Sequence, residues 1–435
     1  MLRRKRILPM YTLFATLIVA LIATLSAPPA EAVSVPTISY TPGGRQMIYV
    51  NNPELLLNAD LANNRNRAEG RGPSLLTVSI GAGQYRDYFE HLNETGTEVA
   101  YGFYAWNPTN ETVVVNRTAK GWAAGDFRIG AQPFAQLFNN SESTTLTLTP
   151  NTGGWIFRSD ASFGPGGIAQ NGEFLTGVVD FGVAVENNAA AQIIVHHLVY
   201  DPSQFDTLPG SYEYIGYETR MRPSGSPESR TYKGISSSSE VTANLNITIE
   251  STDGPQDLQV SYPQYVADSS GTYVPGPTIT SPRWYTHDIP SRDRTDSQVV
   301  ANDMRSFDMP GWGLVNPLTR SSAPLPGETQ NSYPNFGNWG VVYNHNIAIT
   351  NNSDRTRAIE ARLGIYNTTD SDNALFAYQI NNGAWQTGAI VESDGQSVVS
   401  LGTIDAAPGP STHTVRMVLG APADGRLFHA LTLID

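Results

Sequence analysis

The chain has 435 residues, no cysteine and a formal net charge of −13. The lack of cysteine excludes disulfides, thiol catalysis and thiolate metal sites, and the acidic balance argues against nucleic-acid binding. Only 15% of the residues are charged, while glycine (39) and proline (29) are frequent. This composition is typical of a turn-rich, extracellular all-β protein.

The amino-terminal segment 1–32 has the features of a secretory signal. Basic residues at 3–6 precede an apolar run from Leu13 to Leu25, and Ala30-Glu31-Ala32 provides a small-x-small cleavage site. The alternative, a membrane anchor, is disfavoured because the run is short and ends at two prolines. Cleavage after Ala32 leaves no transmembrane anchor. It removes four basic residues and one acidic residue, so 23 basic and 39 acidic residues remain, a net charge of −16.

Residues 33–200 are predicted to form a first β-sandwich domain. Runs of alternating apolar and polar residues predict strands at 45–50, 73–80, 144–149 and 153–158. The segment GAQPFAQLFNN (130–140) predicts one of the few helices. Residues 201–240 are polar and are expected to be a linker or a long connection.

A second β-sandwich domain is predicted for residues 241–435. Its expected strands include 375–380, 395–402, 412–419 and 428–434, and a second short helix is expected at 297–307. The stretch 264–337 is rich in Pro, Gly, Asp and Ser and is expected to be an irregular insertion. The fold class is therefore all-β, with two jelly-roll or immunoglobulin-like sandwiches, long loops and one or two short helices.

One pattern recurs along the chain: two alternating runs separated by turn-forming residues. It occurs at 98–118 around Asn107, at 175–200 around Asn187-Asn188, at 244–262 around Asp253-Gly254, and at 341–365 around Asn351. Each unit is predicted to be a β-hairpin, since asparagine tolerates the backbone of tight turns. Because hairpins are common in all-β folds, the recurrence has two explanations, convergence or duplication of one domain.

Three segments resemble uncharacterised secreted β-rich surface proteins of Gram-positive, spore-forming bacteria. They are MIYVNNPELLLNADLA (47–62), the aromatic-rich unit ending in Asn107, and GNWGVVYNHNIAITNNS (337–353). The resemblance covers about a third of the chain in separate pieces. It implies a location outside the cell or at its surface, and it assigns no catalytic residue.

The common enzyme motifs are missing from the sequence, including GxSxG, SxxK, HExxH and a phosphate-binding glycine loop. Glycosidases that use two carboxylates have no compact signature, so that activity stays open. His196 and His197 are adjacent in a predicted strand and point to opposite faces, so they are not expected to share a metal ion. One is expected to pack inward and the other to meet water.

Asp370-Ser371-Asp372-Asn373 has the alternating oxygen ligands of a calcium loop but lacks the glycine and distant glutamate of an EF-hand. Asp370 and Asp372 are therefore candidate calcium ligands, with an ordinary polar turn as the alternative. No other cofactor is predicted.

The aromatic residues give the strongest functional indication. Trp284, Tyr285 and Trp312 lie in the irregular 264–337 stretch, where loops can display rings to a sugar. They are candidate ligand-binding residues, and packing in the core is the alternative. The sequence thus predicts a secreted, non-catalytic protein of the cell surface, envelope or matrix that binds cell-wall or extracellular polysaccharide. An extracellular polysaccharide-acting enzyme and a purely structural, self-assembling surface protein are the alternatives.

Overall fold

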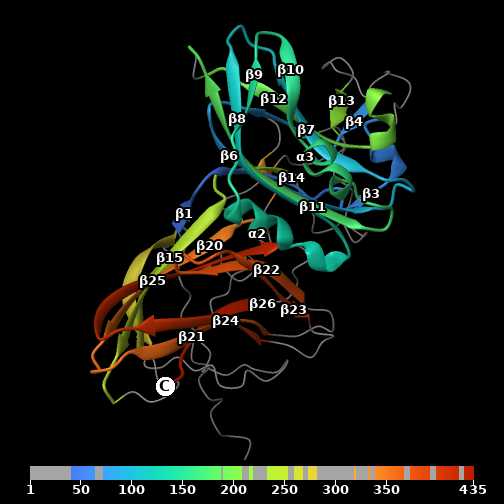
Figure 1. Ribbon diagram of the computed structural model, residues 1–435. Coiled ribbons are helices and arrows are strands. Elements are labelled where there is room, and N and C mark those ends of the chain that lie inside the picture. Colours follow the sequence, from blue (N-terminus) through green and yellow to red (C-terminus); the bar gives the residue numbers. More distant parts are fainter. Residues whose placement is uncertain are drawn as a thin grey trace, which may run out of the picture.

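The computed structural model describes residues 41–63, 72–187, 190–207, 215–218, 233–252, 259–267, 273–281, 318–319, 332–333, 339–366, 373–391, 398–420 and 426–435. Within these residues the strands form five sheets, most of them antiparallel, which gather into an upper and a lower lobe (Figure 1). The predicted signal segment 1–32 and the predicted helix at 297–307 lie outside the described residues.

The upper lobe contains a nine-stranded and a four-stranded sheet that face each other, with a small parallel pair beside them. The larger sheet comprises β2 (Gln46–Val50), β3 (Leu55–Leu56), β6 (Gly83–Asn93), β8 (Val113–Gly125), β9 (Thr144–Leu148), β11 (Phe174–Val185), β14 (Lys233–Ser236), β18 (Leu318–Thr319) and β19 (Ser332–Tyr333). The smaller sheet comprises β5 (Leu76–Ile80), β7 (Ala100–Asn107), β10 (Thr152–Arg158) and β12 (Ile193–Tyr200), and the pair is β4 (Gly72–Ser74) with β13 (Ile215–Glu218).

The lower lobe contains an eight-stranded and a three-stranded sheet. The larger sheet comprises β1 (Thr41–Gly43), β15 (Glu240–Ile249), β16 (Gln259–Ala267), β17 (Tyr273–Ser281), β20 (Val342–Asn351), β22 (Asn373–Ile380), β23 (Gln386–Val391) and β25 (Gly409–Gly420). The smaller sheet comprises β21 (Arg357–Tyr366), β24 (Val398–Ala406) and β26 (Arg426–Leu433). Each strand that the sequence predicts by alternation overlaps one of these strands, so those predictions are confirmed.

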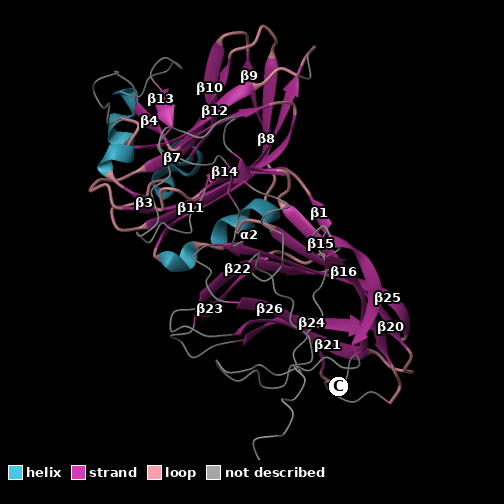
Figure 2. Cartoon of the chain, turned by 180° about the vertical axis from the view of Figure 1, so that it is seen from behind, coloured by secondary structure: helices cyan, strands magenta, loops and turns pink. Residues whose placement is uncertain are grey.

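Two short α-helices lie among the described residues, α2 (Gln132–Asn139) and α3 (Ser159–Phe163). Short 3-10 turns accompany them at Asn58–Asp60, Phe127–Ile129, Gly164–Gly167 and Pro202–Thr207. Helix α2 coincides with the predicted helix at 130–140. Figure 2, which views the chain from behind, shows α2 between the two lobes. Pro133 occupies its first turn, and Phe134 and Leu137 bury one face.

The two lobes share one strand order. The larger sheet of the upper lobe contains the strand order β2-β6-β11-β8-β9, and the larger sheet of the lower lobe contains the order β15-β20-β25-β22-β23. Taken position by position, the strands of the two orders correspond. The first pair is parallel in both cases, β2 with β6 and β15 with β20. The facing sheets also correspond, as β10-β7-β12 and β24-β21-β26. Strands β15 and β20 of the lower lobe correspond to β2 and β6 of the upper lobe. The 264–337 stretch lies in the connection between β15 and β20, and β17 lies within this stretch.

Three of the four predicted hairpins are wrong, because their two strands belong to different sheets. β7 and β8, β11 and β12, and β20 and β21 each cross from one sheet to the facing sheet as arches, whereas β15 and β16 pair directly. Asparagine explains the arch at 351: its buried Nδ2 donates to the carbonyls of Arg355 and Ala406, both at 2.8 Å. Its Oδ1 accepts from the backbone N–H of Ser353 at 3.0 Å. The side chain thus supplies hydrogen bonds that a hairpin partner would otherwise supply.

Two hydrophobic cores organise the molecule. One fills the space between the two sheets of the upper lobe and includes Phe89, Tyr101 and Phe103. The other fills the lower lobe and continues without a break onto the outer face of the upper lobe, where Tyr88, Phe134 and Val178 belong to it. The outer face of the nine-stranded sheet is therefore buried against α2 and the lower lobe.

Candidate functional site

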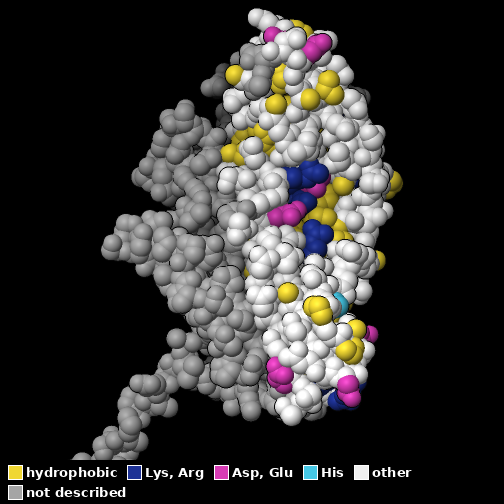
Figure 3. Space-filling model, turned by 90° about the vertical axis from the view of Figure 1, so that its left-hand side faces the viewer, with side chains coloured by type: hydrophobic (Ala, Val, Ile, Leu, Met, Phe, Trp, Pro, Cys, Tyr) yellow, Lys and Arg dark blue, Asp and Glu magenta, His cyan; other side chains and the backbone are white. Residues whose placement is uncertain are grey.

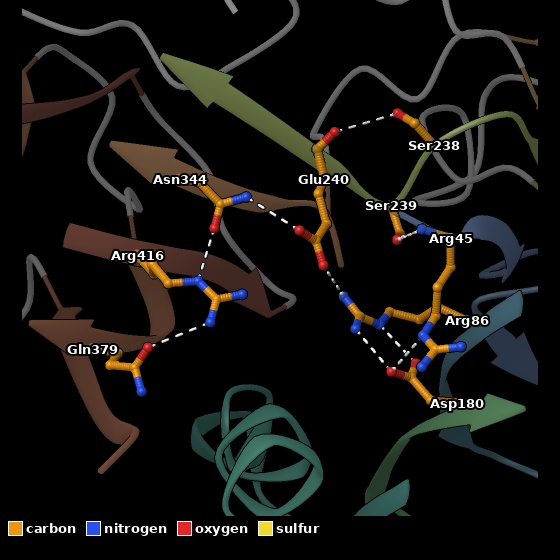
Figure 4. A network of polar contacts seen from close by, with 9 residues as sticks. All are labelled: Arg45, Arg86, Asp180, Ser238, Ser239, Glu240, Asn344, Gln379 and Arg416. Carbon is orange, nitrogen blue, oxygen red and sulfur yellow. Dashed lines mark hydrogen bonds and ion pairs between the residues drawn. The ribbon is translucent and has the colours of Figure 1, made fainter. Parts of the chain in front are cut away.

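The junction of the two lobes carries a network of polar side chains (Figure 4). Arg86 on β6 lies directly opposite Asp180 on β11. Its Nε and Nη2 donate to the two carboxylate oxygens of Asp180 at 2.8 and 2.9 Å. Arg86 and Asp180 are both buried, and the paired geometry satisfies both charges. Burial alone lowers the pKa of Arg86, but the carboxylates of Asp180 and Glu240 together raise it above its usual value.

Two further residues extend this pair toward the lower lobe. Arg45, just before β2, contacts Asp180 at 3.1 Å through Nε, and its backbone N–H donates to Ser239 Oγ at 3.0 Å. Glu240, the first residue of β15, lies 3.9 Å from Arg86 Nη1. Because Glu240 also accepts from Asn344 Nδ2 at 3.2 Å, the network passes from one lobe into the other.

The lower-lobe end of the network is Arg416 on β25. Its Nε donates to Asn344 Oδ1 at 2.7 Å and its Nη1 to Gln379 Oε1 at 3.3 Å. The guanidinium carbon lies 5.1 Å from the ring centroid of Trp385 and 5.9 Å from that of Phe138 on α2. Burial and the nearby Arg86 lower the pKa of Arg416, although Glu240 opposes them.

The junction occupies equivalent positions in the two lobes. Arg86 faces Asp180 across β6 and β11, and Asn344 faces Arg416 across the equivalent strands β20 and β25. On the face drawn in Figure 3, basic and acidic side chains gather with apolar ones about halfway down. Directly below this cluster the drawn surface is mostly neutral, with a histidine, and acidic and basic side chains return toward the lower end of the molecule (Figure 3).

That neutral surface corresponds to a regular array on the outer face of the eight-stranded sheet, which we name the Asn/Thr face. Across β15 and β20, Asn244 lies opposite Asn346 and Thr248 opposite Thr350. All members are exposed or half-buried and none is charged. The members of the Asn/Thr face are Thr242, Asn244, Asn246, Thr248, Asn344, Asn346, Ala348, Thr350, Thr412 and Thr414.

A second polar cluster lies inside the upper lobe. The carboxylate of Asp87 lies 3.3 Å from His197 Nε2, and His197 Nδ1 lies 3.1 Å from the Tyr101 hydroxyl. All three side chains are fully buried. Burial raises the pKa of Asp87 well above its usual value and lowers the pKa of His197 to about 3, with the charges of His196, His91 and Lys233 adding to the effect. Burial thus favours the neutral form of both side chains.

Although an acid, an imidazole and a phenol stand in line, this cluster is sealed inside the core and offers no path to a substrate. The prediction that one of the two histidines packs inward is confirmed, because His197 is fully buried. The prediction that the other meets water is wrong, because His196 is only 5% exposed and shares a hydrogen bond with Thr77 Oγ1 at 3.1 Å. Burial lowers the pKa of His196 to about 4.

The candidate residues predicted from the sequence are not among the described residues. Trp284, Tyr285, Trp312, Asp370 and Asp372 all lie in segments outside them, so their roles stay predictions. Within the described residues, no group of three or more acidic or histidine side chains could hold a metal ion. Nor does any helix described there have the length and apolar character needed to cross a membrane.

Sequence reasoning missed the residues of the junction and of the Asn/Thr face. Nothing in the sequence around Arg86 and Asp180 indicates a buried ion pair, because charged residues are ordinarily expected to lie at the solvent-exposed surface. The Asn/Thr face did leave a trace, since the polar positions of 242–248 and 344–350 alternate with apolar ones. That alternation identifies an outward face but says nothing of its neighbours.

Comparison with known proteins adds little. No family model and no curated protein matches the chain. Among solved structures, a multicopper oxidase from Campylobacter jejuni aligns over 76% of this chain and 47% of its own, with 8% identity and a TM-score of 0.12. The CUB1-EGF-CUB2 domains of rat MASP-1 align over 83% and 98%, with 8% identity and a TM-score of 0.13. The ANX2 ectodomain from Arabidopsis thaliana aligns over 90% and 96%, with 10% identity and a TM-score of 0.16.

The chain thus spans less than half the length of the oxidase, and these TM-scores carry no inference about function.

Proposed function

We propose that this chain is a secreted, non-catalytic surface protein of two duplicated β-sandwich domains, jelly-roll or immunoglobulin-like, and that it binds glycan. The shared strand order of the lobes, with a parallel first pair in each, supports duplication. The segment 1–32 and the resemblance to secreted surface proteins support export. The mature protein should then begin near Val33, and sequencing of its amino terminus after secretion checks this.

The observation that carries glycan binding is the Asn/Thr face. In the upper lobe, the equivalent outer face presents Tyr88 and Val178 and is buried against α2 and the lower lobe. In the lower lobe, the members of the Asn/Thr face are neutral and exposed or half-buried. In a chain of net charge −16 after cleavage, a group of neighbouring rows without charged side chains fits a hydroxyl-rich partner of low charge density.

The geometry of the face suits an extended sugar chain. Neighbouring strands are about 4.8 Å apart, so side chains in register form rows at a regular spacing. Amides and hydroxyls both donate and accept, as sugar hydroxyls do. Asn346 Nδ2 already donates to Asn244 Oδ1 at 3.0 Å, which orients both amides on the surface. Such a face would bind a sugar chain through many hydrogen bonds, and each of these replaces a hydrogen bond between the protein and water.

In the two polar clusters described above, the surroundings of the carboxylates favour binding over a hydrolytic reaction. Asp180 is paired with Arg86, and Asp87 is sealed within the upper core. A paired, buried carboxylate and an enclosed one do not form the two-carboxylate arrangement that flanks a glycosidic bond. A scaffold without ligand is the remaining alternative, and the following experiment separates it from a binding protein.

The test measures retention of the mature protein on insoluble cellulose and on cell-wall preparations. We expect wild type to be retained, and a triple variant Asn244→Ala/Asn346→Ala/Thr414→Ala to lose about tenfold in affinity while its melting temperature changes little. The matched control is Thr145→Ala/Thr147→Ala on β9, which removes exposed hydroxyls from another strand. Wild type that is not retained by any polysaccharide overturns glycan binding.

Variants Trp284→Ala and Trp312→Ala, measured in parallel, decide whether the 264–337 stretch contributes. If they abolish retention while the triple variant binds like wild type, the Asn/Thr face is not the site.

A further inference from the structure

We infer that Arg416 binds a carboxylate of the polymer that lies on the Asn/Thr face, so that the ligand is a sparsely acidic polysaccharide. This inference rests on the proposed function and names the class of glycan. It depends on the contacts of Arg416, on the local charge balance and on the position of the residue at the edge of the face.

Arg416 is held in place by neutral groups. Two amide oxygens, of Asn344 and Gln379, accept from its Nε and Nη1. No hydrogen bond of its remaining nitrogen, Nη2, is drawn in Figure 4. Arg416 is half-buried, so part of its side chain is accessible to solvent. The rings of Trp385 and Phe138 pack beside the guanidinium and fix its plane.

The charge of Arg416 is not matched by a carboxylate. Every other half-buried or buried arginine among the described residues has an acidic partner within 4 Å: Arg45 and Arg86 have Asp180, Arg117 has Glu142, Arg158 has Asp160, Arg357 has Asp435 and Arg362 has Glu360. No such ion pair involves Arg416 among the described residues. A partly buried cation without a counterion is unfavourable, and a bound anion would relieve this.

The junction as a whole has one positive charge in excess. Its three arginines, Arg45, Arg86 and Arg416, face the carboxylates of Asp180 and Glu240 only. In an otherwise acidic protein this excess gives a local attraction for a single negative group. A densely sulfated or phosphorylated polymer would be repelled by the remaining net charge, whereas a polymer with widely spaced carboxylates would not.

Arg416 also stands where such a group would arrive. It is in register with Asn344, and Asn344 is opposite Thr242, so the three form the first row of the Asn/Thr face. Asn346 with Thr414, and Ala348 with Thr412, form the next rows. A chain laid along these rows places one substituent beside Nη2, while its neutral units meet the amides and hydroxyls.

The experiment compares unmodified cellulose with lightly carboxymethylated cellulose as probes for the full mature chain. Wild type should bind the carboxylated polymer about tenfold more tightly at low salt, with the advantage shrinking as salt rises. Arg416→Gln keeps a polar side chain beside Asn344 but removes the charge. It should lose the preference and still bind unmodified cellulose.

Arg355→Gln provides the control, since Arg355 is exposed and lies in the turn between β20 and β21. It should behave as wild type, and Arg416→Lys should restore part of the preference. Retention of neither polymer by wild type overturns the proposed function itself. Equal retention of both polymers, or equal losses in the Arg416 and Arg355 variants, overturns only the role of Arg416. Competition by dextran sulfate or polyglutamate as strong as that by the carboxylated glycan overturns the assignment of ligand class.

Discussion

The residue that most departs from ordinary behaviour is Asp87. It points into the upper core from β6, where Tyr85 and Phe89 share its face, and it is fully buried. Burial favours the protonated carboxyl and raises the pKa of Asp87 well above its usual value. Between the unfolded pKa and the raised folded pKa, folding therefore takes up a proton. Below the unfolded pKa of about 3.9 this uptake costs nothing, and stability then declines as the pH rises toward the raised folded pKa.

Asp87→Asn removes the proton uptake while keeping a neutral side chain of the same shape. The free energy of unfolding of the variant minus that of wild type should therefore increase with pH, by up to about 1.4 kcal/mol per unit from about pH 4 until the raised folded pKa of Asp87 is reached. The low pKa of His197 makes stability rise with pH, but this contribution is present in both wild type and variant and cancels in the difference. Urea unfolding at each pH measures the difference, with exposed Asp354→Asn as control. A difference that does not change with pH would show that Asp87 is ionised in the fold.

At the scale of elements, the arch replaces the hairpin as the recurring unit. Asn93, Asn107 and Asn351 each end a strand, are buried, and accept a hydrogen bond from the backbone N–H two residues later. In each case a Ser or Thr at that later position also donates its hydroxyl to the asparagine, at 2.6–2.7 Å. Asn93 follows β6 and Asn351 follows β20, so these two occupy equivalent places in the lobes.

Asn351→Ala should lower the free energy of unfolding by about 2–4 kcal/mol. The substitution leaves the carbonyls of Arg355 and Ala406 and the N–H of Ser353 without their partner in a buried site. Asn352→Ala, at the exposed neighbouring position, should cost less than about 1 kcal/mol. Chemical denaturation of both variants makes the comparison. Equal losses would mean that the arch is held by its sheets alone.

The elements also show how far the sequence can be used for prediction. Alternation identified the strands around Asn107 and Asn351, because period-two patterns report which side chains face the core. It could not identify partners, and so arches were mistaken for hairpins. Strand β6 was not predicted at all, since Arg86, Asp87, Glu90 and His91 place polar groups on both of its faces. Arg86 is paired with Asp180 on β11, His91 bonds the carbonyl of Pro53, and Asp87 lies beside His197 on β12. These are contacts between residues far apart in the sequence, which alternation cannot report.

At the scale of the whole molecule, the lobes are joined by ring stacking, hydrogen bonds and a shared core. Phe138 of α2 stacks on Trp385 with ring centroids 4.2 Å apart, and Asn139 exchanges two hydrogen bonds with the Trp385 backbone. The lower core continues onto the upper lobe. Arg86 and Asp180 add a buried ion pair whose charges are shared with Glu240 across the junction. This rigidity keeps Arg416 in line with the Asn/Thr face.

A glycine at the junction permits a direct test of how the two lobes are coupled. A Cβ at Gly420, at the end of β25, would lie 2.1 Å from the carbonyl oxygen of Gly130, just before α2. Gly420→Ala must therefore separate the two backbones and weaken the junction. Wild type should unfold in one calorimetric transition, and Gly420→Ala should unfold in two, because the upper lobe retains a core of its own.

The matched control crowds the lower lobe away from the junction. A Cβ at Gly388 would lie 2.4 Å from the ring of Phe376 in the same sheet, so Gly388→Ala should lower the melting temperature without splitting the transition. If wild type itself unfolds in two transitions, the lobes are independent units. In that case the continuous core and the ion pair at the junction would not couple their stabilities, and Arg416 would not be held rigidly beside α2.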